Sequence, residues 1–406
     1  MTYIWPRLHL MELTPAGKRL ALAAKAVFPA VYTNNYNPPE DMDAVEWLDA
    51  WKDNVTEYDH FDCRDDQELT RLCNVLRQCT NLKVVCMVDS SNDAAVVEAV
   101  MATARSIEVA YSQRCATLLA TLARWLASGH AEHLCFEETR SNDDEDDEPV
   151  NESLAQLFAQ PTTLSSLALC LDADGILGPL VAVARSFPQL VSLRIDNFRV
   201  SDTPTVLRLL HELNTTRLRS LDLGGNFVCS VDALLGTLAS LTALEELRIM
   251  SARILDPAFE TGIALTIRRV KLFKVEFSEA SWQVFSAHVA HLEEFTWHGF
   301  SHANPPIETI CVIGDEGAFH LAGFLPRTTS SVGAVVDINC PQLSARSYVA
   351  FGEALASCSG ISIALPPPIE RKMVEAQTAL RSIQHRYGTV DGRLRLVLES
   401  HAMPAI

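Results

Sequence analysis

The stretch Ser220-Leu221-Asp222-Leu223-Gly224-Gly225-Asn226, preceded by Leu218, fits the pattern LxxLxLxxN and decides the fold of this chain. Apolar residues with the same spacing recur through the centre of the sequence, and the first residues of successive copies lie 26, 28, 26, 23 and 25 residues apart. One apolar template at a nearly fixed period indicates a repeat protein. The clear copies are Leu164/Leu167/Leu169, Leu190/Leu193/Ile195, Leu218/Leu221/Leu223, Leu244/Leu247/Ile249, Ile267/Val270/Leu272 and Leu292/Phe295/Trp297.

Weaker copies continue the series in both directions. We therefore predict a single irregular solenoid over residues 1–406, closed by a helix and a strand within residues 366–406. Toward the N-terminus the copies are Trp5/Leu8/Leu10, Phe28/Val31, Val55/Tyr58, Leu82/Val85/Met87, Ile107/Val109 and Leu134/Phe136. Toward the C-terminus they are Val336/Ile338 and Ile361/Ile363, followed by the alternating Leu394, Leu396 and Leu398 of the expected closing strand.

Each repeat contains two different apolar periods. Leu221 and Leu223 alternate with a polar residue, which is typical of a strand with one buried face. After a turn the period lengthens to that of a helix, with apolar residues at 234, 235, 238 and 241. Asp202-Thr203-Pro204 is a good helix start in the preceding repeat, with a capping oxygen before a proline. The sequence thus predicts strand, turn and helix in every repeat.

These repeats resemble leucine-rich repeats, and their length with one helix per unit is similar to that of the ribonuclease-inhibitor-like subgroup. The resemblance implies an α/β leucine-rich-repeat solenoid, a horseshoe with a parallel concave sheet and outer helices. Asn226 occupies the family's Asn position, whose side chain satisfies turn backbone groups in regular members. The corresponding residues in other repeats are Phe198, Ala252 and Val275, so we expect an irregular curvature.

Two segments interrupt the repeats. Residues 141–152 begin with the acidic run Ser-Asn-Asp-Asp-Glu-Asp-Asp-Glu and should form a solvated loop insertion. This loop is either an insertion without a role or a tether that docks a basic partner. Residues 298–331 are expected to be an irregular repeat or an inserted hairpin, with a helix from Phe319 to Leu325.

Composition narrows the classes of function. The chain carries a formal net charge of -18. Residues 1–150 contain 26 acidic and 13 basic side chains, giving -13, and the remaining residues contain 25 and 20, giving -5. Phosphate backbones would be repelled, so we expect no nucleic-acid partner. No apolar run is long enough for a membrane span, and the N-terminal residues do not have the pattern of a secretion signal.

The 11 cysteines are an odd number without paired CxxC spacing, which favours reduced residues that pack as small apolar side chains. We therefore expect a cytoplasmic or nuclear protein. Histidine pairs at 130/133, 288/291 and 298/302 have helical spacing, but no neighbouring ligand completes a metal site. No nucleophile elbow or phosphate-binding glycine motif is present. The sequence predicts no catalytic, cofactor-binding or metal-binding residues and hence no enzyme.

The concave sheet surface is the remaining candidate site. Residues between the buried strand positions should point outward, and side chains on adjacent strands lie about 5 Å apart. These residues form either a cross-strand charge ladder that stabilises the sheet or a patch that binds a protein partner. The candidate partner-binding residues are Arg194, Asp222, Arg248, Arg269, Lys271 and Phe273. Thr296 holds the same central position in the next strand, and Ser192, Asp196 and Glu246 are flanking residues.

We interpret the chain as a scaffold that binds a protein partner through its concave sheet. The resemblance implies one setting, substrate recognition in a ubiquitin ligase, because such repeats often follow an F-box. The first repeat-like strand begins at Trp5, which leaves no room for an F-box ahead of it in this sequence. The alternative is a GTPase-activating protein or another catalytic regulator on the same scaffold. The sequence does not indicate the partner's identity or the oligomeric state.

Overall fold

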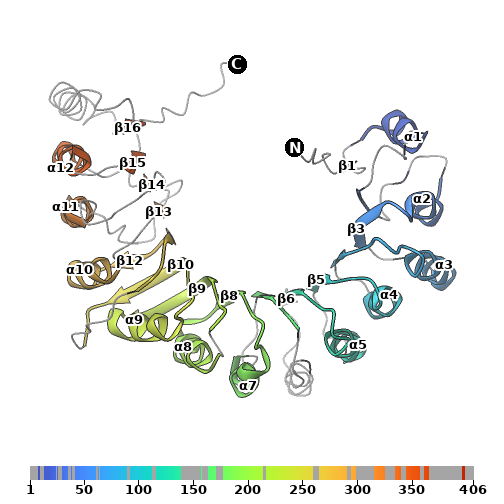
Figure 1. The fold of residues 1–406 in the computed structure, drawn as a ribbon, viewed down its shortest axis with the longest axis horizontal. Coiled ribbons are helices and arrows are strands. Elements are labelled where there is room, and N and C mark those ends of the chain that lie inside the picture. The colour runs from blue at the N-terminus through green and yellow to red at the C-terminus, as the bar shows by residue number, and fades with distance from the viewer. Residues whose placement is uncertain are drawn as a thin grey trace. The chain divides into compact units, whose positions relative to one another are not determined.

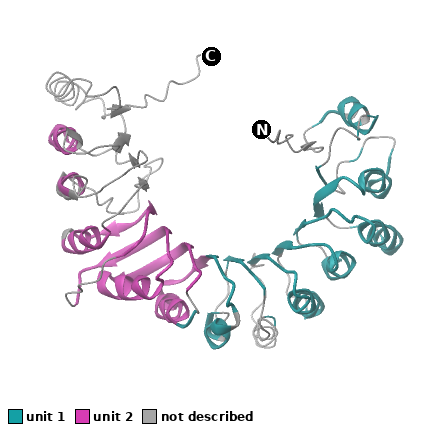
Figure 2. Cartoon of the chain, viewed as in Figure 1, with its two compact units in different colours: residues 1–193, 212–214 teal, residues 194–211, 215–406 magenta. Residues whose placement is uncertain are grey.

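In a computed structural model the chain forms two compact units (Figure 2), residues 1–193 with 212–214 and residues 194–211 with 215–406. We call them unit 1 and unit 2. The structure describes residues 8–9, 13–23, 25, 30–34, 38, 42–60, 63, 65–88, 92–111, 116–138, 157, 163–170, 177–213, 216–258, 265–289, 294–298, 315–324, 334–339, 344–356, 361–364 and 396–397.

Unit 1 alternates strands and helices, and each of its strands pairs in parallel with the next one along the sequence (Figure 1). The strands are β1 (Leu8–His9), β2 (Val31–Asn34), β3 (Val55–His60), β4 (Val84–Val88), β5 (Ser106–Tyr111), β6 (His133–Glu138) and β7 (Ser166–Cys170). The helices are α1 (Pro15–Ala23), α2 (Ala44–Trp51), α3 (Asp66–Leu76), α4 (Asp93–Val100), α5 (Ala116–Leu126) and α7 (Leu177–Val183), followed by the 3-10 helix η3 (Ala184–Ser186).

Unit 2 has the same alternation, with parallel strand pairs that follow the sequence from β9 onward except that β12 pairs with β10 and β11 with β13. Its strands are β8 (Ser192–Phe198), which begins in unit 1, β9 (Ser220–Ser230), β10 (Glu246–Leu255), β11 (Arg269–Phe273), β12 (Glu276–Phe277), β13 (Glu294–His298), β14 (Ala334–Asn339), β15 (Ile361–Ala364) and β16 (Leu396–Val397). Its helices are η4 (Val200–Asp202), α8 (Thr203–Glu212), α9 (Val231–Ser240), α10 (Glu279–His288), α11 (Asp315–Phe324) and α12 (Ala345–Ala356).

The core of each unit is a set of apolar rows that run across the strands. In unit 1 Tyr58, Val85, Ile107 and Leu134 stand in register and are each 0% exposed. Each row buries apolar area between neighbouring coils, so that a coil depends on its neighbours for a complete core. In unit 2 the rows are Leu221/Leu247/Val270 and Leu223/Ile249/Leu272, all fully buried.

Parallel strands joined by helices, with the repeated apolar rows, show the α/β leucine-rich-repeat solenoid that the sequence predicts. Every residue of the weak copies from Val31 to Phe136 falls on a described strand except Leu82, which precedes β4, so the template holds where the leucines are replaced by other apolar residues. In each unit the helices cover one face of the sheet and leave the other face open (Figure 1). None of the helices in the described part has the length and apolar character that a membrane crossing requires.

The turn predicted directly after Leu223 is wrong. β9 continues to Ser230 and β10 continues to Leu255, and these extensions pair with each other. The reason is that Phe227 and Cys229, like Ala252 and Ile254, alternate with more exposed residues and are themselves buried. Each chain therefore keeps a strand pattern beyond the first apolar pair.

The assignment of Asn226 to the family's Asn position is also wrong. A β-bulge separates the two parts of the β9–β10 pairing, so that Phe227, not Asn226, stands beside Ala252. Phe227 is 0% exposed, whereas Asn226 is exposed. The buried position in successive coils is accordingly held by Phe198, Phe227, Ala252 and Val275.

A residue with positive φ precedes this buried position in three coils. Asn197, Ser251 and Lys274 have φ values of 63°, 57° and 54°. Such left-handed residues redirect the chain sharply, and asparagine is one of the few residues that adopt the conformation readily. In these three coils they explain how the chain bends after the first buried pair of the strand.

Helix α8 begins within the predicted start Asp202-Thr203-Pro204. Thr203 is its first residue, and Asp202 lies in the preceding 3-10 helix η4. The Asp202 carboxylate accepts a hydrogen bond from the backbone N–H of Arg199 at 3.0 Å, so it supports η4 instead of capping α8. Helix α9, in contrast, has Ser230 as its N-cap, which accepts from the Ala233 N–H at 3.4 Å.

Other predictions meet the structure in part. The helix expected at Phe319–Leu325 is confirmed by α11, and β16 provides two residues of the closing strand. A helix in every repeat is not seen between β10 and β11, where residues 256–258 and 265–268 hold none. The acidic insertion at 141–152, most of 298–331 and most of 366–406 lie outside the described residues. One solenoid over the whole chain stays a prediction.

Candidate functional site

The predicted partner-binding residues lie together on the open sheet face of unit 2. We call this surface the strand face and define it by nine residues of β8, β9, β10 and β11. Arg194, Asp222, Arg248 and Lys271 each stand between two buried positions of their strand, as the alternation predicts. The other five residues flank them, and Asp196 is itself buried. The strand face consists of Arg194, Asp196, Asp222, Glu246, Arg248, Met250, Arg269, Lys271 and Phe273.

The parallel register aligns these side chains in three rows. Asp222, Arg248 and Lys271 are Cα partners in one row, and Glu246 and Arg269 are partners in the row before it. Met250 stands beside Phe273 in the row after it. Since adjacent strands are about 5 Å apart, oppositely charged residues of a row and its neighbours can reach each other.

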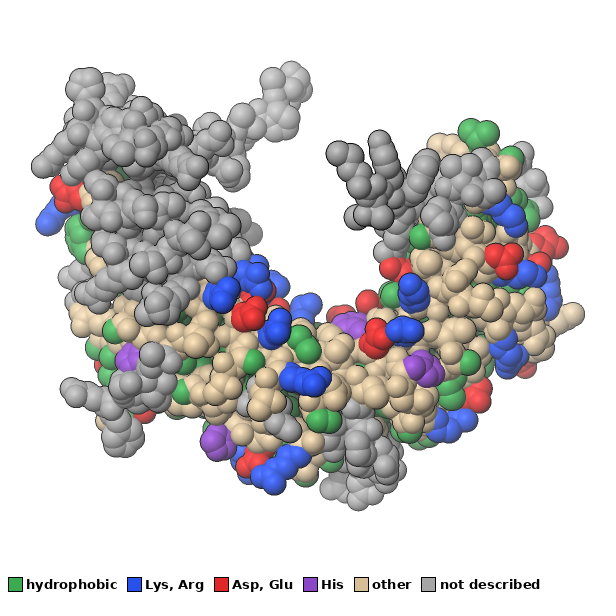
Figure 3. Space-filling view, in the orientation of Figure 1, with side chains coloured by type: hydrophobic (Ala, Val, Ile, Leu, Met, Phe, Trp, Pro, Cys, Tyr) green, Lys and Arg blue, Asp and Glu red, His purple; other side chains and the backbone are tan. Residues whose placement is uncertain are grey.

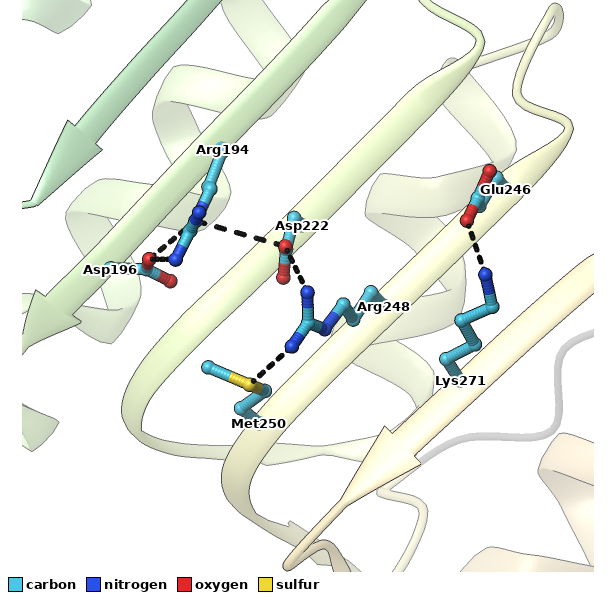
Figure 4. Close-up of polar contacts among 7 residues, drawn as sticks. All are labelled: Arg194, Asp196, Asp222, Glu246, Arg248, Met250 and Lys271. Carbon is cyan, nitrogen blue, oxygen red and sulfur yellow. Dashed lines mark hydrogen bonds and ion pairs between the residues drawn. The ribbon is translucent and has the colours of Figure 1, made fainter. Parts of the chain in front are cut away.

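Asp222 is the centre of the first charge cluster (Figure 4). Its Oδ2 lies 3.3 Å from Nη1 of Arg248 and 3.8 Å from Nε of Arg194. Arg194 also forms an ion pair with Asp196 of its own strand. Two arginines and two aspartates thus alternate across β8, β9 and β10.

Glu246 is the centre of the second cluster. Its Oε1 lies 3.0 Å from Nζ of Lys271, and its Oε2 lies 3.3 Å from Nε of Arg269. Both cations come from β11, so this carboxylate connects two neighbouring strands. Exposed pairs of this kind contribute about 0–1 kcal/mol each, which makes the ladder a modest stabilising factor.

Arg248 also makes contacts that are not ionic. Its guanidinium carbon lies 4.9 Å from the ring centre of Phe273, a cation–π arrangement, and its Nη2 lies 3.2 Å from Sδ of Met250. An arginine that stacks on an aromatic ring is held in one conformation before a partner arrives. Less side-chain entropy is then lost on binding.

Burial raises the pKa of the Asp222 carboxyl, an effect that Arg248 and Arg194 oppose and the nearby Asp196 reinforces. The Oδ1 of Asp222 is buried and has no hydrogen-bond partner in the described part of the chain, which adds to the cost of the charge. Keeping the Asp222 carboxylate charged therefore costs stability, and the two arginines beside it offset part of that cost.

The cations of the strand face remain accessible. The side chains of Arg194, Arg248, Arg269 and Lys271 are 50%, 37%, 43% and 30% exposed. Acidic and basic side chains are interspersed in the space-filling view, without a large apolar patch among the coloured residues (Figure 3). A polar partner surface can therefore reach these groups directly.

Sequence reasoning placed all six candidate residues correctly on adjacent strands, and it also named Asp196 and Glu246 as flanking residues. It missed Met250, whose position next to Phe273 becomes visible only from the strand register. Thr296 lies on β13, but its side chain is outside the described residues. Partner binding by the strand face stays a prediction, because the same charge ladder also stabilises the sheet.

The histidine pairs do not come together with further ligands in the described structure. Nε2 of His133 lies 4.0 Å from Oε1 of Glu108. No group of three or more His, Cys, Asp or Glu side chains suited to a metal ion occurs among the residues that are described. His291 and His302 fall outside them.

Three of the cysteines in the described segments, Cys73, Cys79 and Cys229, are buried and free. Burial raises the pKa of Cys79 and of Cys229 to about 12, so both thiols are uncharged at neutral pH. These residues pack as small apolar side chains, as the sequence predicts.

Comparison with known proteins gives similarity in fold only. No protein-family model and no curated protein matches the chain. A chain in the crystal structure of the Rad7 and Elc1 complex in yeast aligns with a TM-score of 0.43 and 12% identity, over 92% of this chain and 81% of that one. An internalin from Listeria monocytogenes aligns with a TM-score of 0.41 and 15% identity, over 78% of this chain and 82% of the internalin. Similarity at this level does not indicate a function.

Proposed function

We propose that this protein is an interaction scaffold whose strand face in unit 2 binds a protein partner. The observation that carries the proposal is the arrangement of Arg248 over Phe273, with Lys271 and Arg269 on the neighbouring strand and every cation at least 30% exposed. Arginine and aromatic residues are enriched at the energetic centres of interfaces. A pre-positioned arginine–aromatic pair among accessible charges suits a partner with complementary carboxylates and apolar groups.

The competing reading is that the ladder only stabilises the sheet. The two readings differ in what they predict for charge removal. If the ladder is structural, replacing cations with glutamine lowers stability by no more than about 1 kcal/mol per pair and leaves binding unchanged. If it is a binding surface, the same change lowers the affinity for the partner while the protein remains folded.

The test is affinity capture with a triple variant, Arg248→Gln, Arg269→Gln and Lys271→Gln, beside wild type. A matched control removes three cations that lie outside the strand face, Arg77→Gln, Arg208→Gln and Arg217→Gln. Circular dichroism and thermal unfolding establish that both variants are folded. We expect partners captured by wild type and by the control to be lost from the strand-face variant. An unchanged set of captured proteins from a folded strand-face variant contradicts the proposal.

We further propose that the repeats belong to the ribonuclease-inhibitor-like type and that the protein acts in the cytoplasm or nucleus. Substrate recognition in a ubiquitin ligase is the setting that the sequence resemblance implies. Co-purification with a Skp-like or cullin-like protein tests that setting, and its absence from all captured complexes argues against it. The catalytic-regulator alternative predicts acceleration of GTP hydrolysis by a small GTPase, which a panel of purified GTPases measures directly.

A further inference from the structure

A groove of about 740 Å³ lies in unit 2 at the end of the strands, beyond the charged rows of the strand face. Four successive coils contribute to it, because the residues after each strand bend stand side by side. Ala252 pairs with Phe227, and Arg253 pairs with both Val228 and Glu276. The groove lining comprises Arg199, Val200, Ser201, Asn226, Phe227, Val228, Ser251, Ala252, Arg253, Lys274 and Glu276.

The groove follows from two irregularities of the repeat. The buried position changes from Phe198 and Phe227 to the small Ala252, which removes side-chain volume beneath Ser251. The bulge in β9 moves Asn226 outward to an exposed position. A short apolar floor therefore lies between polar side chains on the rim.

The charge of this groove is opposite to that of the whole chain. Three cations, Arg199, Arg253 and Lys274, line it with a single acidic residue, Glu276, so its lining carries a net charge of +2 in a chain of -18. Glu276 is 14% exposed and lies 2.9 Å from Nε of Arg253, whose own side chain is 61% exposed. Arg199 and Lys274 are also exposed. A local cationic groove on an acidic protein concentrates anionic groups at one place.

We propose that this groove binds an extended acidic segment of a partner protein. The guanidinium groups of Arg199 and Arg253 and the ammonium group of Lys274 pair with carboxylates, while Val200 and Val228 contact apolar side chains between them. Ser251 and Asn226 offer hydrogen bonds to the peptide backbone. A peptide is favoured over nucleic acid because the net charge of -18 repels a long polyphosphate, whereas a short peptide presents only a few charges.

The groove and the strand face are different surfaces, so the proposal goes beyond the proposed function and is tested separately. A fluorescein-labelled peptide of alternating glutamate and alanine serves as the probe, and fluorescence anisotropy measures its binding at low ionic strength. The groove variant is Arg199→Glu with Lys274→Glu. The matched control is Arg208→Glu with Arg217→Glu, which changes the net charge equally outside the groove. The strand-face variant Arg248→Gln with Lys271→Gln is measured beside them, and loss of binding in it but not in the groove variant overturns the proposal.

We expect wild type to bind the acidic peptide and to lose affinity as salt is added. The groove variant should bind at least about tenfold more weakly, and the equal-charge control should stay within about twofold of wild type. Circular dichroism establishes that each variant is folded. Equal weakening in the groove variant and the equal-charge control overturns the proposal, as does the absence of binding to wild type. Equally tight binding of an oligonucleotide with the same number of charges overturns the assignment to a peptide.

Discussion

Gly225→Ala should destabilise the protein, because a β-carbon at this position has no space. It would lie 2.7 Å from the carbonyl oxygen and 2.9 Å from the backbone nitrogen of Phe198 on the neighbouring strand. Ordinary contact begins at 3.4 Å, so the two backbones must separate by about 0.7 Å, the difference between 3.4 and 2.7. Backbone cannot rotate away as the end of a flexible side chain can, and the strands must move apart.

The free-energy change has two opposing parts. Overpacking costs about 1–3 kcal/mol, and the lower entropy of the unfolded chain with alanine returns about 0.4–1 kcal/mol. The expected net loss in the free energy of unfolding is therefore about 1.3 kcal/mol from the centres of the two ranges, within limits of roughly 0–2.6 kcal/mol. Gly236→Ala is the matched control, since this glycine lies within α9 and a β-carbon there meets nothing within 4 Å. Alanine should stabilise that helix by about 0.5–1 kcal/mol.

Urea unfolding monitored by circular dichroism measures both variants against wild type. The same chemical change should move the unfolding midpoint downward at Gly225 and upward at Gly236. A Gly225→Ala protein that is as stable as Gly236→Ala would refute the close approach of β9 to Phe198. It would also refute the bulge that places Asn226 on the rim of the groove.

Three further predictions concern single side chains. Asp43→Ala removes an N-cap whose carboxylate accepts from the Glu46 N–H at 2.7 Å, and thermal unfolding should show a loss of about 1 kcal/mol. Burial opposes the charge of Asp43, but hydrogen bonds from the Glu46 N–H and from Arg71 outweigh burial and lower the pKa of this carboxyl. The stabilisation by the Asp43 cap should therefore be lost as the pH falls below 3.8 through the lowered pKa. The pH dependence expected for Asp222 is the opposite, because the pKa of this carboxyl is raised in the folded protein. The free energy of unfolding of the wild type should increase as the pH falls through the raised pKa toward 3.8. Asp222→Asn should show a flatter profile of unfolding free energy against pH. Phe273→Leu keeps apolar volume but removes the ring beneath Arg248, and should cost about 0.5–1 kcal/mol by urea unfolding, a loss that is absent when Arg248 is already alanine.

The strands could be predicted from the sequence because their signal is the burial of alternate side chains. Val85 and Ile107 occupy the same buried row as Leu134, although only the last is a leucine. Burial selects for apolar character and volume, and the exact side chain matters less. Strand positions could therefore be predicted even where the repeat motif is degenerate.

The outward-facing residues could be predicted for the same reason, since a strand with one buried face fixes the direction of its other side chains. The ion pairs that these side chains form could not be predicted. Asp222 meets both Arg194 and Arg248, and this depends on the registers of three strands that are separated by whole repeats. The groove was missed entirely because its residues lie after the strand bends, where the sequence pattern suggests only a turn.

The bulge in β9 explains why the repeat motif misleads at this one place. Three residues lie between Leu223 and Phe227, whereas two lie between Ile249 and Ala252, although both pairs occupy equivalent rows. The extra residue shifts the alternation by one, so that Phe227 enters the core and Asn226 turns outward. The shift needs glycine, because Gly225 passes within contact distance of Phe198. A sequence that fits the motif of the regular repeat therefore folds differently from it, and this difference places the polar side chain of Asn226 in the cationic groove.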